Sequence, residues 1–193
     1  YMIAGLVRSD SGKILIDEED VTDKTVSLRA SKGLAYLPQE PSVFGRLTVE
    51  ENILAALEQR RDINKEQKQR ELERLVEEFQ LKRFLKTKSI KLSGGERRRV
   101  EIARSLSSNP RFILLDEPFA GIDPIAVSEL KKTLKKLKSL KLGILISDHN
   151  VRETMQICDN VLIMSEGKAI AEGTPKEVSA NDLVKEVYLG QDF

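Results

Sequence analysis

The sequence predicts an α/β protein in which a parallel sheet is combined with an all-helical insert. Short apolar runs of the kind found in buried parallel strands alternate with longer amphipathic stretches of helical period. Alternating strands and helices favour a parallel sheet, because each crossover helix returns the chain to the same end of the sheet. From about residue 41 to residue 91, by contrast, the chain has helical patterns and no strand pattern.

Composition sets broad limits on the kind of protein. The chain has 193 residues, of which 40% are hydrophobic and 33% charged, which is enough for one or two compact units with a buried core. Its net charge of +1 gives no indication of nucleic-acid binding, and a single cysteine excludes an intrachain disulfide. No apolar run approaches the roughly 20 residues of a membrane-spanning helix. We therefore expect no direct membrane insertion and a membrane link only through a partner.

In the first half of the chain, each expected element has its own local signal. The pattern predicts, in order, the end of a helix at 1–7, strands at 13–17 and 33–37, and helices at 48–58 and 64–80. The first helix stops at a Ser-Asp-Ser-Gly turn. In the last helix, Leu72, Leu75, Val76 and Phe79 fall at i, i+3, i+4 and i+7, the spacing of one buried face. The opposite face is dense in charge and is most simply a solvated surface.

The second half continues the alternation of strand and helix. The expected elements are a helix at 95–107, a strand at 112–115, a helix at 124–140, a strand at 143–147, a hairpin formed by 161–165 and 168–171, and a helix at 182–189. The helix at 95–107 ends before an Asn-Pro step, and both single strands are continuous apolar runs. A Glu-Gly pair between the last two strands is a hairpin signal.

Polar landmarks follow several of these apolar runs. Gln39 comes just after one strand, Asp116 and Glu117 end another, and His149 follows a third. The turn at 92–96, Leu-Ser-Gly-Gly-Glu, opens a helix, and a helix N-terminus presents free N–H groups that suit a phosphate. Two acids at the carboxyl end of a strand suit Mg²⁺ and an attacking water. The pattern is therefore typical of phosphoryl transfer.

Each landmark also has a simpler interpretation. Ser93 and Glu96 fit the S-x-x-E pattern of an ordinary helix-capping box, and that motif alone favours the cap. Asp116 and Glu117 alone are a charged strand end, and His149 alone is equally well a satisfied histidine after a strand. The order and spacing of all of them together are not explained in this way.

In order and spacing the chain resembles the ATP-binding-cassette (ABC) ATPases. Gln39 is similar to their Q-loop glutamine, 92–96 to their signature motif, 113–117 to their Walker B strand, 121–123 to their D-loop and His149 to their H-switch. The resemblance implies a P-loop NTPase-type (RecA-like) fold. In that fold, residues 1–40 and 92–193 would form the ATP-binding core and residues 41–91 an α-helical subdomain.

The resemblance also implies a role for each matching residue, with ATP and Mg²⁺ as cofactors. Asp116 would bind Mg²⁺ together with Gln39, Glu117 would polarise the attacking water, and His149 would contact the γ-phosphate. A further group would act on the nucleotide of the opposite subunit of a homodimer: Ser93, Gly94, Gly95 and Asp123. A site divided in this way needs two chains, so closure of the dimer would assemble it.

The family's partners are two polytopic membrane subunits. The resemblance places their docking site near Phe44 and Arg46, after the Q-loop, on a cytoplasmic protein that is peripheral to the inner membrane. The alternative is that Phe44 packs inside the helical subdomain. Local strings at 36–40, 92–104, 116–124, 148–154 and 187–193 are similar to the lipopolysaccharide-export ATPases of this family, with the branched-chain amino-acid importer ATPases as runner-up.

The sequence departs from the family at its start. No G-x-x-x-x-G-K-S/T motif occurs in the 193 residues, and the family's P-loop would lie immediately before Tyr1. The aromatic residue that stacks on adenine is missing as well. We therefore expect the 193 residues alone to be inactive. A hydrolysis-incompetent interaction module is the alternative, and Gln39, Glu117 and His149 argue against it because such a module does not need them.

Overall fold

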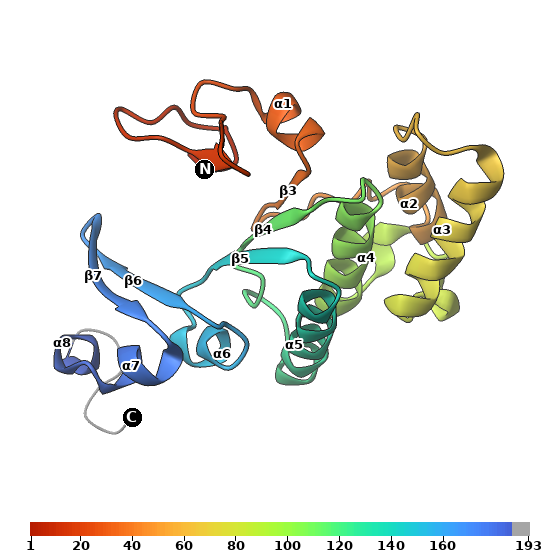
Figure 1. Ribbon diagram of the computed structural model, residues 1–193. Coiled ribbons are helices and arrows are strands. Elements are labelled where there is room, and N and C mark those ends of the chain that lie inside the picture. The colour runs from red at the N-terminus through yellow and green to blue at the C-terminus, as the bar shows by residue number, and fades with distance from the viewer. Residues whose placement is uncertain (187–193) are drawn as a thin grey trace. The chain divides into compact units, whose positions relative to one another are not determined.

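The computed structural model describes residues 1–186 and confirms the α/β prediction (Figure 1). The chain forms two compact units, Tyr1–Ser147 and Asp148–Phe193. None of the helices in residues 1–186 is both long enough and apolar enough to cross a bilayer.

A parallel sheet of three strands lies at the centre of the first unit. Its strands are β3 (Leu34–Leu37), β4 (Phe112–Asp116) and β5 (Gly143–Ser147), in the order β3-β4-β5. Leu37 is in register with Leu115, and Asp116 with Ser147, so the three strands end at the same edge of the sheet. Ile113 and Leu115 of β4 are buried, whereas Phe112 and Leu114, which alternate with them, are only half-buried, so one face of the strand is fully covered and the other is not.

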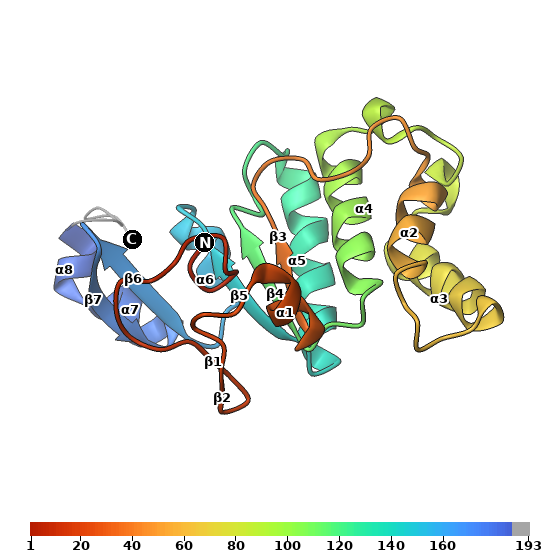
Figure 2. The same ribbon diagram turned by 90° about the horizontal axis from the view of Figure 1, so that it is seen from above.

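The longer helices lie on one side of this sheet (Figure 2). They are α4 (Gly94–Leu106), α5 (Pro124–Ser139), α2 (Val49–Leu57) and α3 (Lys65–Glu78). Helix α4 contacts β3, α5 and α2, and α2 in turn contacts α3. Capping boxes begin α2, α3 and α4, which explains why their starts could be predicted from the sequence.

Residues 41–91, all of which are described, are built from helices as predicted. Besides α2 and α3 they contain two short 3₁₀ helices, Lys82–Phe84 and Ser89–Lys91, which had no clear sequence signal. Phe79 and Leu81, which follow α3, are buried. The segment belongs to the same compact unit as the sheet, so its behaviour as a separate subdomain stays a prediction.

The N-terminal region differs from the prediction. Residues 1–7 form turns instead of a helix, although Gly5 N–H to Met2 and Leu6 N–H to Tyr1 are the two hydrogen bonds that close a helix C-terminus. Gly5 has a φ of +84°, the left-handed conformation that such a closure requires. The buried Arg29 fixes this turn by donating to the Met2 and Ile3 carbonyls at 2.6 and 2.8 Å. Carbonyls in the last turn before such a closure lack partners within the turn, and Arg29 satisfies two of them.

Three short elements in this region support Arg29 and the sheet. Strand β1 (Leu15–Ile16) was predicted, whereas its antiparallel partner β2 (Glu19–Asp20) and helix α1 (Val26–Ser31) were not. Two-residue and six-residue elements give too little periodicity to be recognised in a sequence.

The second unit is a hairpin with short helices. It consists of α6 (Val151–Met155), β6 (Val161–Ser165), β7 (Lys168–Gly173), α7 (Pro175–Ala180) and α8 (Asp182–Val184). The hairpin was predicted, and α6 and α7 were not. Met155, Ile163, Val178 and Val184 form its core. The helix expected at 182–189 begins at Asp182, and positions 187–189 lie outside the described residues.

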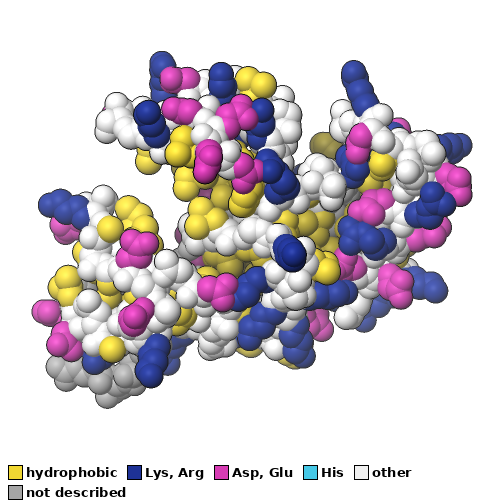
Figure 3. Space-filling view, viewed as in Figure 1, with side chains coloured by type: hydrophobic (Ala, Val, Ile, Leu, Met, Phe, Trp, Pro, Cys, Tyr) yellow, Lys and Arg dark blue, Asp and Glu magenta, His cyan; other side chains and the backbone are white. Residues whose placement is uncertain are grey.

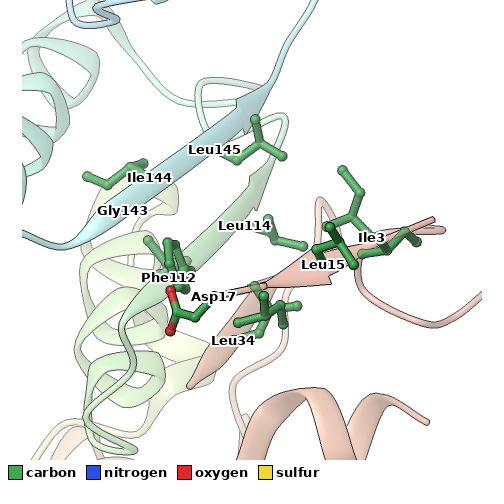
Figure 4. Close-up of a pocket in the computed structure, with 12 residues that line it drawn as sticks. Ile3, Leu15, Asp17, Leu34, Phe112, Leu114, Gly143, Ile144 and Leu145 are labelled. Atoms are coloured by element: carbon green, nitrogen blue, oxygen red, sulfur yellow. The ribbon is translucent and has the colours of Figure 1, made fainter. Parts of the chain in front are cut away.

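An apolar groove of about 330 Å³ lies in the first unit, between its N-terminal segment and the sheet. Figure 3 shows hydrophobic side chains gathered there, and Figure 4 shows Ile3 and Leu15 facing Leu114 and Leu34 across it. None of the residues predicted to handle nucleotide lines this groove. The candidate site lies instead at the carboxyl ends of the strands.

Candidate functional site

The predicted polar residues meet where the parallel strands end. Asp116 is the last residue of β4, Glu117 follows it, and Gln39 lies two residues after β3. The Gln39 amide nitrogen donates to Glu117 Oε2 at 2.8 Å. A carboxylate only accepts hydrogen bonds, so this contact turns the amide oxygen of Gln39 away from Glu117 and leaves it available as an acceptor. Gln39 and Glu117, 78 residues apart in the chain, are thus brought together.

The Asp116 carboxylate is held from both sides. Tyr36 Oη donates to Asp116 Oδ2 at 3.1 Å, and Ser147 Oγ donates to Asp116 Oδ1 at 2.6 Å. Burial, and then the hydrogen bond to Asp116, raise the pKa of the Tyr36 phenol to about 12, so the hydroxyl remains a donor at neutral pH. The two donors therefore hold the Asp116 carboxylate in one orientation, with one hydrogen bond to each of its oxygens.

Glu117 adopts an unusual backbone conformation. Its φ is +42°, the left-handed region, which costs about 1–3 kcal/mol for a residue other than glycine. The conformation is fixed by a 2.7 Å hydrogen bond from Glu117 N–H to the Ser147 carbonyl of the neighbouring strand. Backbone strain of this kind is common at sites where a side chain must point in one direction. Here the strained residue directly follows Asp116, the acid expected to bind Mg²⁺.

A buried ion pair on α4 ties the site together, and the sequence analysis missed it. Arg98 pairs with Glu101 at 3.2 Å, and both side chains are more than nine-tenths buried. Arg98 also donates to the carbonyls of Pro38, at 2.9 Å, and Asp116, at 3.1 Å. Glu101 accepts from Ser42 N–H at 2.8 Å. The signature helix thus holds both the Gln39 loop and the end of β4. The available signal was two charges on an otherwise apolar helix face.

At the start of α4, Ser93 caps the helix, as the simpler interpretation of the S-x-x-E pattern predicted. Glu96 N–H donates to Ser93 Oγ at 3.3 Å, and Ser93 N–H donates to Glu96 Oε2 at 3.0 Å, which is a complete capping box. The hydrogen bond from Ser93 N–H lowers the pKa of the Glu96 carboxyl. Ser93 remains exposed, so the cap leaves it accessible to another molecule.

The two signature glycines let α4 approach the 121–126 segment closely. A Cβ on Gly95 would lie 2.6 Å from the Ala126 Cβ, which is closer than real Cβ atoms come. A Cβ on Gly94 would lie 3.3 Å from the Gly121 carbonyl oxygen. Close packing against Ala126 therefore favours glycine at position 95, independently of any role toward a ligand.

Gly95→Ala should destabilise the folded protein. The added methyl group meets Ala126 on helix α5, and relieving this overlap by moving the helices apart costs about 1–3 kcal/mol. Urea unfolding of the full-length protein measures the effect. Gly94→Ala is the matched control with a milder contact, and Ala126→Gly should recover part of the loss in the Gly95→Ala background. A Gly95→Ala protein as stable as wild type would show that this close approach is absent.

The remaining predicted residues occupy exposed positions. Asp123 caps α5, and its Oδ1 accepts from Ala126 N–H at 3.0 Å. His149 belongs to the second unit, where its Nδ1 lies 3.9 Å from Asp148 Oδ1. The predicted approach of His149 to a phosphate near Glu117 stays a prediction.

Phe44 is exposed, which disfavours the alternative that it packs inside the helical segment. Its side chain is 56% exposed, and the Arg104 guanidinium lies 5.1 Å from the centre of its ring. The buried Asn52 fixes the loop by accepting from Phe44 N–H at 2.8 Å and donating to its carbonyl at 3.1 Å. Arg46 is also exposed. The loop thus presents an aromatic ring on a rigid backbone.

Comparison with known proteins identifies the family. The sequence profile described as "ABC transporter" matches residues 1–120. The chain belongs to the ABC transporter family. The lipopolysaccharide export system ATP-binding protein LptB of Haemophilus influenzae is 53% identical over all 193 residues, which span 80% of that protein. LptB of Escherichia coli is 49% identical over the same lengths. The chain is thus an ATPase subunit of an ABC transporter and a homologue of LptB.

Solved structures confirm the cassette fold. The ATP-binding cassette MJ1267 of an ABC transporter superposes with a TM-score of 0.85 at 28% identity, covering 98% of this chain and 81% of that one. A second profile, "Branched-chain amino acid ATP-binding cassette transporter", matches residues 170–193. ATP binding follows from the family as a whole. Tyr36, Ser147, Arg98 and Glu101 are the site residues that the sequence analysis did not single out.

Proposed function

We propose that the full-length protein is the Mg²⁺-dependent ATPase that energises lipopolysaccharide export from the inner membrane. The observation that carries the chemistry is the contact between Gln39 and Glu117 beside an Asp116 carboxylate whose two oxygens are both hydrogen-bonded. The transported substrate is inferred from identities of 49–53% to the LptB proteins over the whole chain.

The donor atoms at the strand ends fit Mg²⁺. This ion prefers oxygen ligands and is usually held by one or two carboxylates together with phosphate oxygens and water. Asp116 supplies the carboxylate and Gln39 an amide oxygen. When bound, the ion neutralises charge on the β- and γ-phosphates.

Glu117 and Gln39 act on the attacking water. Glu117 accepts a hydrogen bond from the water and polarises it, and Gln39 keeps the Glu117 carboxylate aimed at it. His149 contacts the γ-phosphate. Most of the rate acceleration in such a reaction comes from positioning and charge stabilisation, so these residues need to be placed and not consumed.

The second half of each site comes from the partner subunit of a homodimer. Ser93, Gly94, Gly95 and Asp123 face the partner's nucleotide across the interface. Ser93 and Gly94 are exposed at the N-terminus of α4, where N–H groups and the helix dipole favour phosphate. In this arrangement residues 1–40 and 92–193 form the RecA-like core and residues 41–91 the helical subdomain.

Reconstitution tests the proposed substrate. The full-length protein, purified with its two membrane subunits and placed in proteoliposomes, should release lipopolysaccharide from the bilayer to a soluble acceptor only with ATP. Branched-chain amino-acid import is the second candidate, because the profile match at 170–193 favours it. ATP-driven leucine uptake without lipopolysaccharide release would replace the first proposal by the second. Residues 1–193 alone, which contain no P-loop motif, should give no ATP turnover.

The membrane subunits dock on the loop that carries Phe44 and Arg46, which makes the protein cytoplasmic and peripheral to the inner membrane. An exposed aromatic ring beside arginines has the composition of an interface hot spot. The two hydrogen bonds between Asn52 and the Phe44 backbone limit the entropy lost when a partner helix binds.

Phe44→Ala should weaken copurification of the membrane subunits, because it removes the aromatic ring that packs against them. An aromatic hot spot contributes about 2 kcal/mol or more, which corresponds to an affinity loss of roughly 30-fold. Leu140→Ala is the matched control, since Leu140 is 59% exposed at the far end of α5. The ATPase rate of the isolated dimer should stay unchanged. A lower melting temperature of the isolated protein, with copurification intact, would assign Phe44 to internal packing.

A further inference from the structure

Three side chains from three strands meet at one corner of the sheet. Tyr36 is in register with Leu114, two residues before Asp116 on β4, and Asp116 is in register with Ser147 on β5. Alternate residues of a strand share a face, so Tyr36, Asp116 and Ser147 lie on the same face of the sheet. It is also the face that carries the apolar groove, which Leu34 and Leu114 line (Figure 4).

We propose that Tyr36 and Ser147 are positioning residues for the Asp116 carboxylate and thereby set its affinity for the metal. The inference rests on the proposed Mg²⁺-dependent ATPase function, and it assigns a task to two residues for which the sequence analysis expected no role at the site. Each donates to a different oxygen of the carboxylate, Tyr36 to Oδ2 and Ser147 to Oδ1.

Two hydrogen-bond donors restrict the orientation of a carboxylate more than one donor does. A single hydrogen bond leaves a carboxylate free to rotate about its last side-chain torsion, which is broad and roughly two-fold. A donor on each oxygen defines the plane of the group, and each oxygen retains a lone pair for a metal ion or a metal-bound water. Partners of this kind orient metal ligands, and their loss typically weakens metal binding about 10–100-fold.

The surroundings make both donors rigid. Tyr36 lies between the buried Leu34 and Leu37 of β3, and the backbone of β3 is paired with β4 along its length. Ser147 is paired with Asp116 in the strand ladder, and its carbonyl accepts the N–H of Glu117 at 2.7 Å. Ser147 thus contacts both acids, one through its side chain and one through its backbone. A serine hydroxyl at this point serves Asp116 without disturbing the backbone that aims Glu117.

The test is the affinity of the full-length protein–ADP complex for Mn²⁺, measured by electron paramagnetic resonance as a probe of the Mg²⁺ position. Tyr36→Phe and Ser147→Ala each remove one oxygen atom and should each raise the Mn²⁺ dissociation constant about 10-fold. Ser105→Ala is the control, since its hydroxyl donates to the Glu101 carbonyl within α4, at 2.9 Å, and should leave Mn²⁺ binding unchanged.

A double-mutant comparison separates positioning from general loss of structure. In an Asp116→Asn background, Tyr36→Phe and Ser147→Ala should have no further effect on Mn²⁺ affinity, because the carboxylate they orient is gone. The same loss in both backgrounds would overturn the proposal, as would wild-type affinity in both single variants. If Asp116→Asn itself left Mn²⁺ binding unchanged, the metal assignment within the proposed function would fail as well. If Asp116→Asn weakened binding and the two variants did not, only the present inference would fail.

Discussion

Glu117→Gln in the full-length protein should bind ATP and hydrolyse it about 10²–10⁴-fold more slowly than wild type. The substitution removes the negative charge that polarises the attacking water and keeps the size and shape of the side chain. A glutamine can still accept the hydrogen bond that Gln39 donates to Glu117, so the loop geometry is retained. The variant should accumulate as an ATP-bound dimer, and single-turnover hydrolysis together with size-exclusion chromatography measures both effects.

The matched control is Glu166→Gln. Glu166 has a φ of +48°, close to the +42° of Glu117, but it lies in the turn between β6 and β7. The control therefore carries the same chemical change at the same kind of backbone position, away from the proposed chemistry. It should hydrolyse ATP at the wild-type rate. Near-normal turnover by Glu117→Gln would assign the base to another residue.

A mixed dimer of one Ser93→Arg subunit and one Glu117→Gln subunit should retain about half of the wild-type turnover when its two sites act independently. If Ser93 serves the partner's nucleotide, both lesions fall on the same composite site and the other site is intact.

The reciprocal dimer provides the control. A subunit carrying both substitutions, paired with a wild-type subunit, has a lesion in each composite site and should be nearly inactive. If Ser93 acted on the nucleotide of its own chain, the results would be exchanged, with the doubly substituted pair half active and the first pair inactive. Nucleotide occupancy of each purified dimer shows whether the two sites influence one another.

The long elements of the fold were predictable because their signals are local. The strands β4 and β5 are apolar runs, and α2, α3 and α4 each begin with a capping pair visible in the sequence. The elements that were missed are short. Helix α1 is held in place by Arg29, whose side chain donates hydrogen bonds to carbonyls more than 20 residues away in the chain. Such a contact leaves no periodic pattern.

The residues of the site also divide into those that the sequence predicts and those that it does not. Gln39 and Glu117 could be brought together in advance, because parallel strands end at a common edge. The donors to Asp116 could not, since Tyr36 reads as an ordinary strand residue and nothing in the sequence marks its hydroxyl as a partner of Asp116. The Arg98–Glu101 pair reads as surface charge until the helix face is known to be buried. Residues that support a site through distant contacts therefore require the structure.

The central claim is that Asp116, Glu117 and Gln39 serve a magnesium-dependent ATPase. Its most direct test is the rate of ATP hydrolysis by the purified full-length protein with its membrane subunits, measured with Mg²⁺ and again after chelation by EDTA. We expect steady turnover with Mg²⁺, complete loss on chelation and recovery when Mg²⁺ is restored. Absence of turnover with Mg²⁺ present, or turnover that EDTA does not affect, would contradict the account.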